Sequence, residues 1–234
     1  MKHSVIIPAY NAAAYIEQSI GSALSQLGVN DEIIIVDDGS NDATIEVVKQ
    51  LRDDRIQLLC QPSNLGIAAA RNRALKVISG DYVHFLDHDD LWSRDRMSIL
   101  SSLMEVQQSD IVSGWVEHFY CDTLTLTQRA QYRLPVPQAA VLPASVVMRR
   151  SLIKQIGLFD PRLSSGEFID LISRVMDLKP SWARTDRVLF LRRIHGRNHT
   201  LTDSTSDTSY IEVIRRHLAR GRVHGRSLSG SQEK

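Results

Sequence analysis

Short apolar runs alternate with helical periodicities along the first half of the chain. Four apolar runs predict strands, at 5–7, 33–36, 56–59 and 82–86. Three segments with apolar residues about 3.6 positions apart predict helices, near 15–27, 45–51 and 67–78. Ser40 or Asn41 is expected to cap the second of these helices. Strands that alternate with helices predict an α/β fold with a doubly wound, mainly parallel sheet that has helices on both faces.

The second half of the chain has a weaker pattern. Residues 115–120 and 123–127 are interpreted as an antiparallel pair of strands, and 188–191 as a further strand. A short helix is predicted at 151–156, and a helix with apolar residues on one side and arginines elsewhere is predicted from Thr208. The chain is therefore divided into 1–115, a smaller subregion of the same domain at 116–206, and a basic helix with a flexible tail at 207–234.

Composition and charge narrow the function classes. The 234 residues are 43% hydrophobic, which is enough for a large core. The net charge is only +1, so no overall field points to a nucleic-acid partner. Cys60 and Cys121 have no metal-ligand spacing, as expected for reduced thiols in a cytoplasmic protein. No run of 18 apolar residues predicts a membrane span. A peripheral contact with the inner face of the membrane would come from the basic helix after Thr208, and packing of this helix on the domain is the alternative.

The strand predicted at 82–86 is followed at once by acidic residues. Asp87 and Asp89 are two positions apart, so their carboxylates leave the same side if the backbone is still extended, and Asp90 adds a third charge. Two carboxylates about 4 Å apart repel by roughly 4 kcal/mol near a protein surface, so the cluster needs a cation or a proton. Mg²⁺ and similar ions take one or two carboxylates and complete their shell with water and nucleotide phosphates. The alternative is a solvated acidic loop that begins the next helix.

Polar residues follow three of the predicted strands. In doubly wound sheets ligands lie beyond the carboxyl ends of the strands, so these residues are expected to meet at one edge. We expect one of Asp37 and Asp38 to face a ligand while the other holds the turn. Arg71 is a candidate partner for a phosphate or for one of the acids, and a surface arginine is the alternative. The three pairs of residues at the strand ends are Tyr10 with Asn11, Asp37 with Asp38, and Asp87 with Asp89.

Four segments carry a resemblance to a known family. In order, they are VIIPAYN, IIIVDDGSNDAT, NLGIAAARNRAL and GDYVHFLDHDDLW, within residues 3–115. They resemble the successive blocks of the family 2 glycosyltransferases, enzymes with the GT-A fold. A later segment, VVMRRSLIKQIGLFDPRLSSGEFIDLISRV, resembles the acceptor-side region of that family. The resemblance implies that 1–115 is the nucleotide-sugar-binding half and 116–206 the acceptor-side half of one GT-A domain.

The resemblance also implies roles for individual residues. Tyr10 would stack on the nucleotide base, Asp38 would hydrogen-bond to it, and Asp87 would approach the ribose. The HGRN segment at 195–198 is similar to a late H-x-x-N element of the family, whose histidine lies at the diphosphate or the metal. The implied nucleotide-binding set is Pro8, Ala9, Tyr10, Asn11, Asp38, Arg71 and Asp87. The implied ligands of a divalent metal, Mn²⁺ or Mg²⁺, are Asp87, Asp89 and His195.

The catalytic segment departs from the family pattern. Relatives usually carry Glu-Asp followed two residues later by another acid, and the Asp of this pair is the usual base. Here Phe168 stands at the place of that aspartate. Glu167 and Asp170 are three positions apart on one predicted helix, so either acid is a candidate base, with Glu167 ranked first. For Asp170 the alternative is a favourable interaction with the helix dipole.

These observations predict an inverting, metal-dependent glycosyltransferase. The donor is a nucleotide-diphosphate sugar, and uridine or thymidine is favoured because Asp38 needs a base N–H. The acceptor is an unknown glycan, lipid-linked or other, and a homo-oligomer is left open. One alternative, motivated by Phe168, is a non-catalytic protein of the same fold that binds a nucleotide sugar or a glycan. A receiver domain, which also carries Asp-Asp after an apolar strand, is a weaker alternative because it is about half this length.

Overall fold

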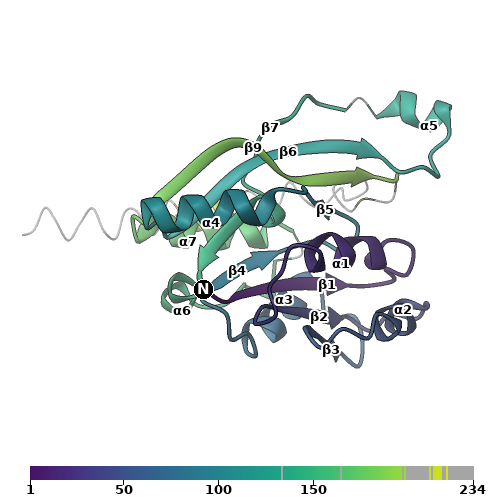
Figure 1. Cartoon of the computed structure of the whole chain (residues 1–234), viewed down its shortest axis with the longest axis horizontal. Coiled ribbons are helices and arrows are strands. Elements are labelled where there is room, and N and C mark those ends of the chain that lie inside the picture. The colour runs from purple at the N-terminus through teal and green to yellow at the C-terminus, as the bar shows by residue number, and fades with distance from the viewer. Residues whose placement is uncertain are drawn as a thin grey trace, which may run out of the picture.

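The computed structural model describes residues 1–132, 134–163, 165–196, 198, 211, 213–217 and 220 of the chain. Within these residues a nine-stranded sheet carries helices on both faces (Figure 1). Its strand order is β3-β2-β1-β4-β8-β6-β9-β5, and β7 pairs with β6. The first half consists of β1 (His3–Ala9), α1 (Ile16–Leu24), β2 (Glu32–Asp37), α2 (Thr44–Gln50), β3 (Ile56–Cys60), α3 (Ile67–Leu75) and β4 (Tyr82–Phe85).

The second half adds the strands that complete the sheet. β8 pairs antiparallel with β4 and with β6, whereas β6 and β9 run parallel to each other. Residue 115 lies inside β6, so the two halves share one continuous sheet. The elements are β5 (Leu91–Trp92), α4 (Arg96–Gln107), β6 (Ile111–Tyr120), α5 (Leu126–Gln131), β7 (Gln138–Ala139), the 3₁₀ turn η1 (Pro143–Ser145), β8 (Val146–Arg149), α6 (Arg150–Ile156), α7 (Glu167–Asp177) and β9 (Trp182–Ile194).

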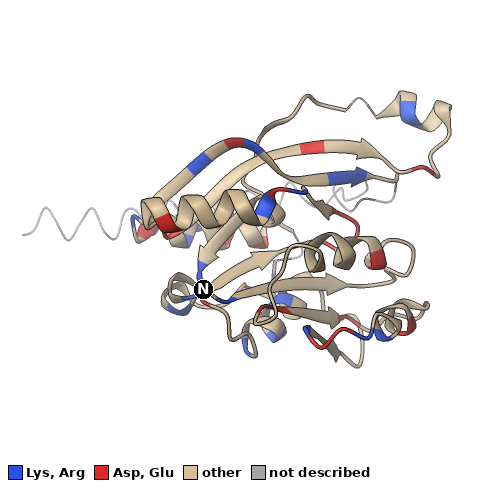
Figure 2. Ribbon diagram, viewed as in Figure 1, with Lys and Arg blue, Asp and Glu red and all other residues tan. Residues whose placement is uncertain are grey.

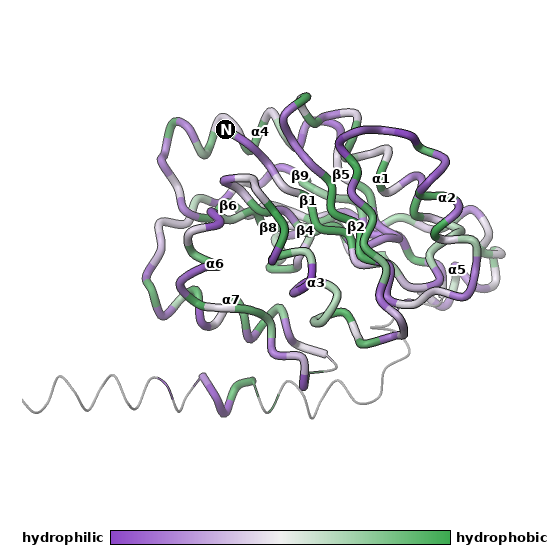
Figure 3. The backbone as a smooth tube through the Cα atoms, turned by 90° about the horizontal axis from the view of Figure 1, so that it is seen from below, coloured by the Kyte–Doolittle hydropathy of each residue, from purple (hydrophilic) through white to green (hydrophobic). Residues whose placement is uncertain are grey.

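The doubly wound, mainly parallel core is confirmed. β1 pairs in parallel with β2 and with β4, and β2 pairs in parallel with β3. The apolar run of β2 is fully buried, and alternate residues enter opposite clusters: Ile33 and Ile35 in one, Ile34 and Val36 in the other. The first cluster includes residues of α1, α2 and α4, and the second includes residues of α3, α6 and α7. Figure 3 shows the hydrophobic strands between these two sets of helices.

Two local predictions are wrong. Residues 115–120 do not pair with 123–127; they pair with β9, and Trp115 and Val116 also pair with β7. Residues 126–131 are instead the helix α5, because Thr125 and Gln128 form a reciprocal capping box at its start. The cap predicted for α2 is also wrong. That helix begins after Ala43, and Ser40 and Asn41 form hydrogen bonds to the loop after β1.

The described part of the C-terminal segment packs on the domain. Residues 211, 213–217 and 220 are helical, and we refer to them as the C-terminal helix. Val213 is 2% exposed, and Arg216 forms an ion pair with Asp160 in the loop before α7. Arg220 pairs with Asp177 at the end of α7. The remaining residues of the predicted tail lie outside the described ranges. Within those ranges we find no helix with the length and apolar character of a membrane span.

Candidate active site

The predicted site residues follow the carboxyl ends of β1, β2 and β4, at one edge of the sheet. Two loops at this edge are joined by backbone-to-side-chain hydrogen bonds. The Asn11 amide donates to Ser40 Oγ at 2.8 Å, and the Asn41 amide donates to Asn11 Oδ1 at 3.0 Å. These contacts hold the turn after β1 in place, with Asn11 at a φ of 49°. Tyr10 is 41% exposed beside them, so its ring is available to a ligand.

Arg71 joins two acids from different elements. It lies on α3 and is 1% exposed. Its Nη2 donates to Asp87 Oδ1 at 2.9 Å, and its Nη1 donates to Glu167 Oε1. The guanidinium also lies over the rings of Phe85 and Phe159, at 5.8 and 5.6 Å from their centroids. A buried guanidinium needs such compensation, so Arg71 fixes the loop after β4 to the start of α7. The prediction that Arg71 pairs with an acid of the site is consistent with this geometry.

Asp89 has a different partner. His195 Nε2 lies 2.9 Å from Asp89 Oδ2, and the His195 ring stacks on Tyr15 with centroids 5.0 Å apart. The Asn198 side chain accepts from the His195 amide at 3.0 Å, which fixes the end of β9. Burial opposes ionisation of Asp89, but the hydrogen bond with His195 and the nearby histidine charges hold its pKa below the ordinary value. The structure therefore places a carboxylate and an imidazole together, as the H-x-x-N element implied.

Asp90 and Arg193 hold the loop between β4 and β5 in place. Asp90 is 5% exposed, and its Oδ1 accepts from the Arg193 amide at 2.9 Å. Burial raises the pKa of Asp90 well above its ordinary value, and the charges of Asp89 and Asp87 raise it further. The Arg193 guanidinium donates to the Asp89 carbonyl at 2.8 Å and to Gln18 Oε1 at 2.7 Å. Figure 2 shows the acidic segment before β5 beside the basic end of β9. Sequence reasoning had not assigned Arg193 this anchoring role.

The backbone around Asp89 is not extended as the argument from two-residue spacing assumed. Residues 88 and 89 form a turn, and the Asp90 amide donates to the Asp87 carbonyl at 3.1 Å. Asp87 therefore meets Arg71 while Asp89 meets His195. Among the described residues no group of three or more His, Cys, Asp or Glu side chains is arranged to hold a metal ion. The Asp89 carboxylate fits Mn²⁺ or Mg²⁺ where water and a diphosphate supply most of the remaining ligands, and the His195 imidazole suits Mn²⁺ better than Mg²⁺, which prefers oxygen ligands.

The two aspartates at the end of β2, Asp37 and Asp38, accept hydrogen bonds from different donors. Asp38 is 4% exposed and accepts from three donors, the Gln61 side chain, the Leu65 amide at 2.8 Å and the Gly66 amide at 2.8 Å. A carboxylate has about four lone-pair positions, so Asp38 retains capacity for one further donor. Asp37 Oδ2 accepts from the Ser40 amide at 3.1 Å. Both residues hold turns, which is more than was expected of Asp38.

The two acids of α7, Glu167 and Asp170, form ion pairs with different arginines. Glu167, 7% exposed, meets Arg71, whereas Asp170, 4% exposed, accepts from Arg174 Nε at 2.9 Å and lies 3.9 Å from Arg220 Nη1. The structure therefore brings Glu167, and not Asp170, to Arg71 and Asp87. Phe168 between them is 4% exposed and packs in the second core cluster, its ring centroid 6.0 Å from that of Phe85.

Restoring an aspartate at position 168 is expected to damage the fold. Phe168→Asp removes a buried ring and places a carboxylate among apolar side chains, so we expect a loss of about 3–5 kcal/mol in the free energy of unfolding. Urea denaturation followed by circular dichroism measures this loss. Ile169→Asp is the matched control, because Ile169 is 45% exposed, and it should change stability by less than about 0.5 kcal/mol. Equal midpoints for the two variants would contradict the packing of Phe168.

The sequence matches a known protein family over about two thirds of its length. The model of the family described as glycosyl transferase family 2 matches residues 4–158. The Escherichia coli protein WfgD, named UDP-Glc:alpha-D-GlcNAc-diphosphoundecaprenol beta-1,3-glucosyltransferase, is 43% identical over 154 residues, 64% of this chain and 61% of WfgD. WfaP of Escherichia coli, with the same description, is 43% identical over 107 residues, 45% of this chain and 42% of WfaP. The chain thus spans less than two thirds of the length of each relative.

Solved structures are similar over nearly the whole chain. Residues 1–349 of Staphylococcus aureus TarS in complex with UDP-GlcNAc superpose with a TM-score of 0.75 at 23% identity, covering 93% of this chain and 65% of that one. The mannosyltransferase PcManGT from Pyrobaculum calidifontis, in complex with GDP-Man and Mn²⁺, gives a TM-score of 0.68 at 18% identity, covering 94% and 63%. At these identities the likeness establishes the fold.

Proposed function

The chain belongs to glycosyl transferase family 2 and has the GT-A fold, and from that premise we propose that it transfers a sugar from a nucleotide-diphosphate donor to an acceptor hydroxyl. The observation that carries the proposal is that neighbouring acids at one sheet edge have separate partners. Asp89 pairs with His195, whereas Asp87 pairs with Arg71, which also holds Glu167. The receiver-domain alternative is wrong, because the family match and the nine-stranded sheet both extend well beyond such a domain.

Asp89 and His195 would hold the divalent metal. The departing nucleoside diphosphate is an anion, and a bound Mn²⁺ or Mg²⁺ supplies the charge that stabilises it. A metal would replace the hydrogen bond that joins Asp89 and His195, and Arg193, which donates to the Asp89 carbonyl, would keep the backbone of Asp89 in place. Asp87 keeps about a third of its side chain exposed, which leaves one side of it for the ribose. The remaining nucleotide contacts would come from Pro8, Ala9, Tyr10, Asn11 and Asp38.

Glu167 is the proposed base. Its Oε1 is held by Arg71, and its Oε2 has no hydrogen-bond partner among the described residues, so Oε2 is available to the acceptor hydroxyl. Deprotonation there directs the hydroxyl at the anomeric carbon from the face opposite the diphosphate, with inversion. A second candidate function is favoured by Phe168. With a buried phenylalanine at the usual base position and Asp170 in an ion pair, the protein would bind a nucleotide sugar without transferring it.

The acceptor is proposed to be a lipid-linked glycan. This proposal rests on WfgD and WfaP, whose names place the acceptor sugar on diphosphoundecaprenol. Residues 1–115 would bind the donor and 116–206 the acceptor. The decisive experiment incubates the protein with Mn²⁺, UDP-glucose and a GlcNAc-diphosphate lipid and measures both transfer and release of UDP. Transfer supports the enzyme; metal-dependent binding of UDP-glucose without transfer to any of a wide acceptor panel supports the binding protein.

Nucleotide preference tests the role of Asp38. Uracil and thymine offer an N3–H to its remaining acceptor position, whereas cytosine N3 has no proton to donate. We expect UDP to bind about tenfold to a hundredfold more tightly than CDP, the range that corresponds to one hydrogen bond with a charged group. Calorimetry with both nucleotides in Mn²⁺ measures the ratio, and ADP serves as a purine control. Tighter binding of CDP than of UDP would contradict this placement of the base.

A further inference from the structure

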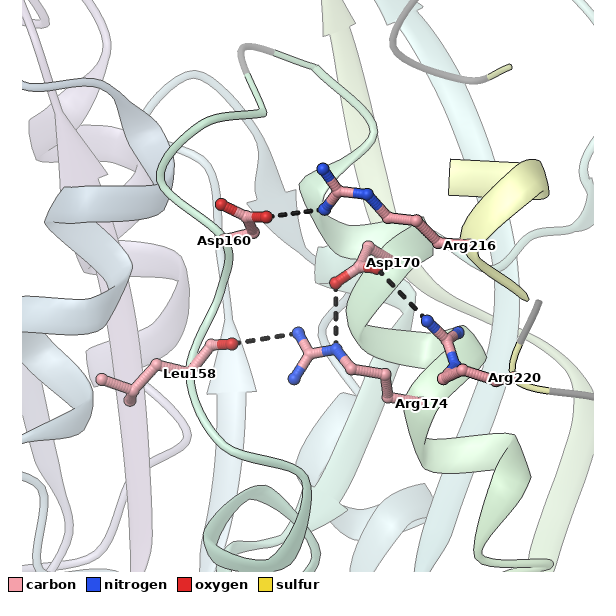
Figure 4. Close-up of a pocket in the computed structure, with 6 residues that line it drawn as sticks. All are labelled: Leu158, Asp160, Asp170, Arg174, Arg216 and Arg220. Carbon is pink, nitrogen blue, oxygen red and sulfur yellow. Dashed lines mark hydrogen bonds and ion pairs between the residues drawn. The ribbon is translucent and has the colours of Figure 1, made fainter. Parts of the chain in front are cut away.

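A charged cavity lies between α7, the C-terminal helix and the loop that follows α6. Its volume is about 440 Å³, within the range of small-ligand sites. Figure 4 shows the side chains around it, with three guanidinium groups and two carboxylates directed toward one another. The lining residues are Leu158, Asp160, Asp170, Arg174, Arg216 and Arg220.

Ion pairs hold these arginines in position. Arg174 donates to Asp170 at 2.9 Å and to the carbonyls of Ile156 and Leu158 at 2.7 and 3.0 Å. Arg216 Nη1 lies 2.6 Å from Asp160, and Arg220 Nε lies 2.8 Å from Asp177. Together with Arg162 and Asp177, which pair with lining residues, the cluster contains four guanidinium groups and three carboxylates, so it carries a net positive charge. Guanidinium groups that are fixed by neighbours are well suited to phosphate, because less side-chain entropy is lost on binding.

The cavity is close to the proposed base. Asp170 follows Glu167 by three residues on α7, which is about 4.5 Å along the helix axis. Glu167 faces Arg71 and the donor side, whereas Asp170 faces the cavity. An acceptor sugar whose hydroxyl lies at Glu167 would therefore have the cavity within about one turn of α7. In a diphosphate-linked acceptor, the diphosphate is on the anomeric carbon, a different ring carbon from the one that carries the attacking hydroxyl.

Apolar side chains are exposed on the same elements. Leu158 on the loop is 43% exposed, and Ile169 on α7 is 45% exposed. The C-terminal helix turns Val213, Arg216 and Arg220 toward the domain and leaves Ile211 and Ile214 48% and 57% exposed. A charged cavity with Leu158 in its lining, and with further exposed apolar side chains on the neighbouring elements, matches an amphiphile that has an anionic head and a hydrocarbon chain.

We propose that this cavity binds the diphosphate group of a lipid-linked acceptor. The proposal rests on the proposed function, since it assigns a subsite to the acceptor of that reaction. The arginines of the C-terminal helix make the decisive contacts with the phosphates, and the exposed isoleucines receive the first part of the lipid chain.

Calorimetry with farnesyl diphosphate tests the proposal. The protein is first saturated with UDP and Mn²⁺, so that the donor diphosphate site is filled. We expect the wild-type protein to bind farnesyl diphosphate, and Arg216→Gln with Arg220→Gln to weaken binding by about tenfold to a hundredfold. Arg215→Gln is the matched control, because Arg215 is exposed on the same helix outside the cavity, and its affinity should equal that of wild type. Thermal midpoints establish that the variants are folded.

Two results would overturn the proposal. One is an unchanged affinity for farnesyl diphosphate in the double arginine variant. The other is equal binding of farnesyl diphosphate and farnesol, because the phosphate groups would then contribute nothing to the affinity. Weaker binding of inorganic diphosphate than of farnesyl diphosphate is expected, and equal binding would contradict the lipid part. Failure of the proposed function has a separate signature, since the wild-type protein would then neither bind UDP-glucose with metal nor release UDP from it.

Discussion

Glu167→Gln is expected to lower kcat for sugar transfer by about 10²- to 10⁴-fold, the usual contribution of a general base, with donor affinity close to that of wild type. Glutamine keeps the shape of the side chain and an oxygen that can accept from Arg71, so the contact between α7 and α3 is retained. It cannot take the proton of the acceptor hydroxyl. Steady-state kinetics with varied acceptor, together with calorimetry of UDP in Mn²⁺, separates turnover from donor binding.

Asp170→Asn is the matched comparison. Asp170 accepts from Arg174 at 2.9 Å and faces the cavity beneath the C-terminal helix, so its loss should affect kcat less than the loss of Glu167 does. If Asp170→Asn has the larger effect, the roles of the two acids are exchanged. If both variants transfer sugar at the wild-type rate, neither residue is the base.

Asp89→Ala is expected to remove most of the binding of UDP that depends on metal. Loss of an outer-shell partner of a metal costs about 10- to 100-fold in affinity, and loss of a proposed direct ligand should cost at least as much. Calorimetry of UDP with Mn²⁺ and with EDTA measures the metal-dependent part in wild type and variant. In wild type the affinity should fall in EDTA, whereas in Asp89→Ala the two affinities should be similar.

Asp95→Ala is the control for Asp89→Ala. Asp95 is an acid a few residues further along the chain, and its side chain is 68% exposed in a surface ion pair with Arg187. Removing it changes the net charge by the same amount without touching the site, so UDP affinity should stay at the wild-type value. A wild-type affinity for UDP that is equal in Mn²⁺ and in EDTA would contradict the metal role of Asp89.

Local patterns were sufficient to predict the parallel core and the sheet edge that holds the candidate site. The β-branched run of β2 is buried on both faces because each neighbouring residue enters a different apolar cluster, a pattern that is visible in the sequence itself. Parallel pairing then places the ends of β1, β2 and β4 together. The order of the family-like segments supplied the GT-A fold, which the comparisons confirm.

The partner of each acid was decided by tertiary structure. Asp87 and Asp89 were expected to leave the same side of an extended strand, but the turn at 88–89 and the anchor between Asp90 and Arg193 send them to different partners. Arg193 follows Asp90 by 103 residues in the sequence, so no local pattern predicts this contact. Helical spacing likewise placed Glu167 and Asp170 on one face. Asp170 meets Arg174 four residues further along the same helix, a pairing that local spacing allows. The pairing of Glu167 with Arg71 depends on how α3 packs against α7, and that packing is set by side chains from the whole chain.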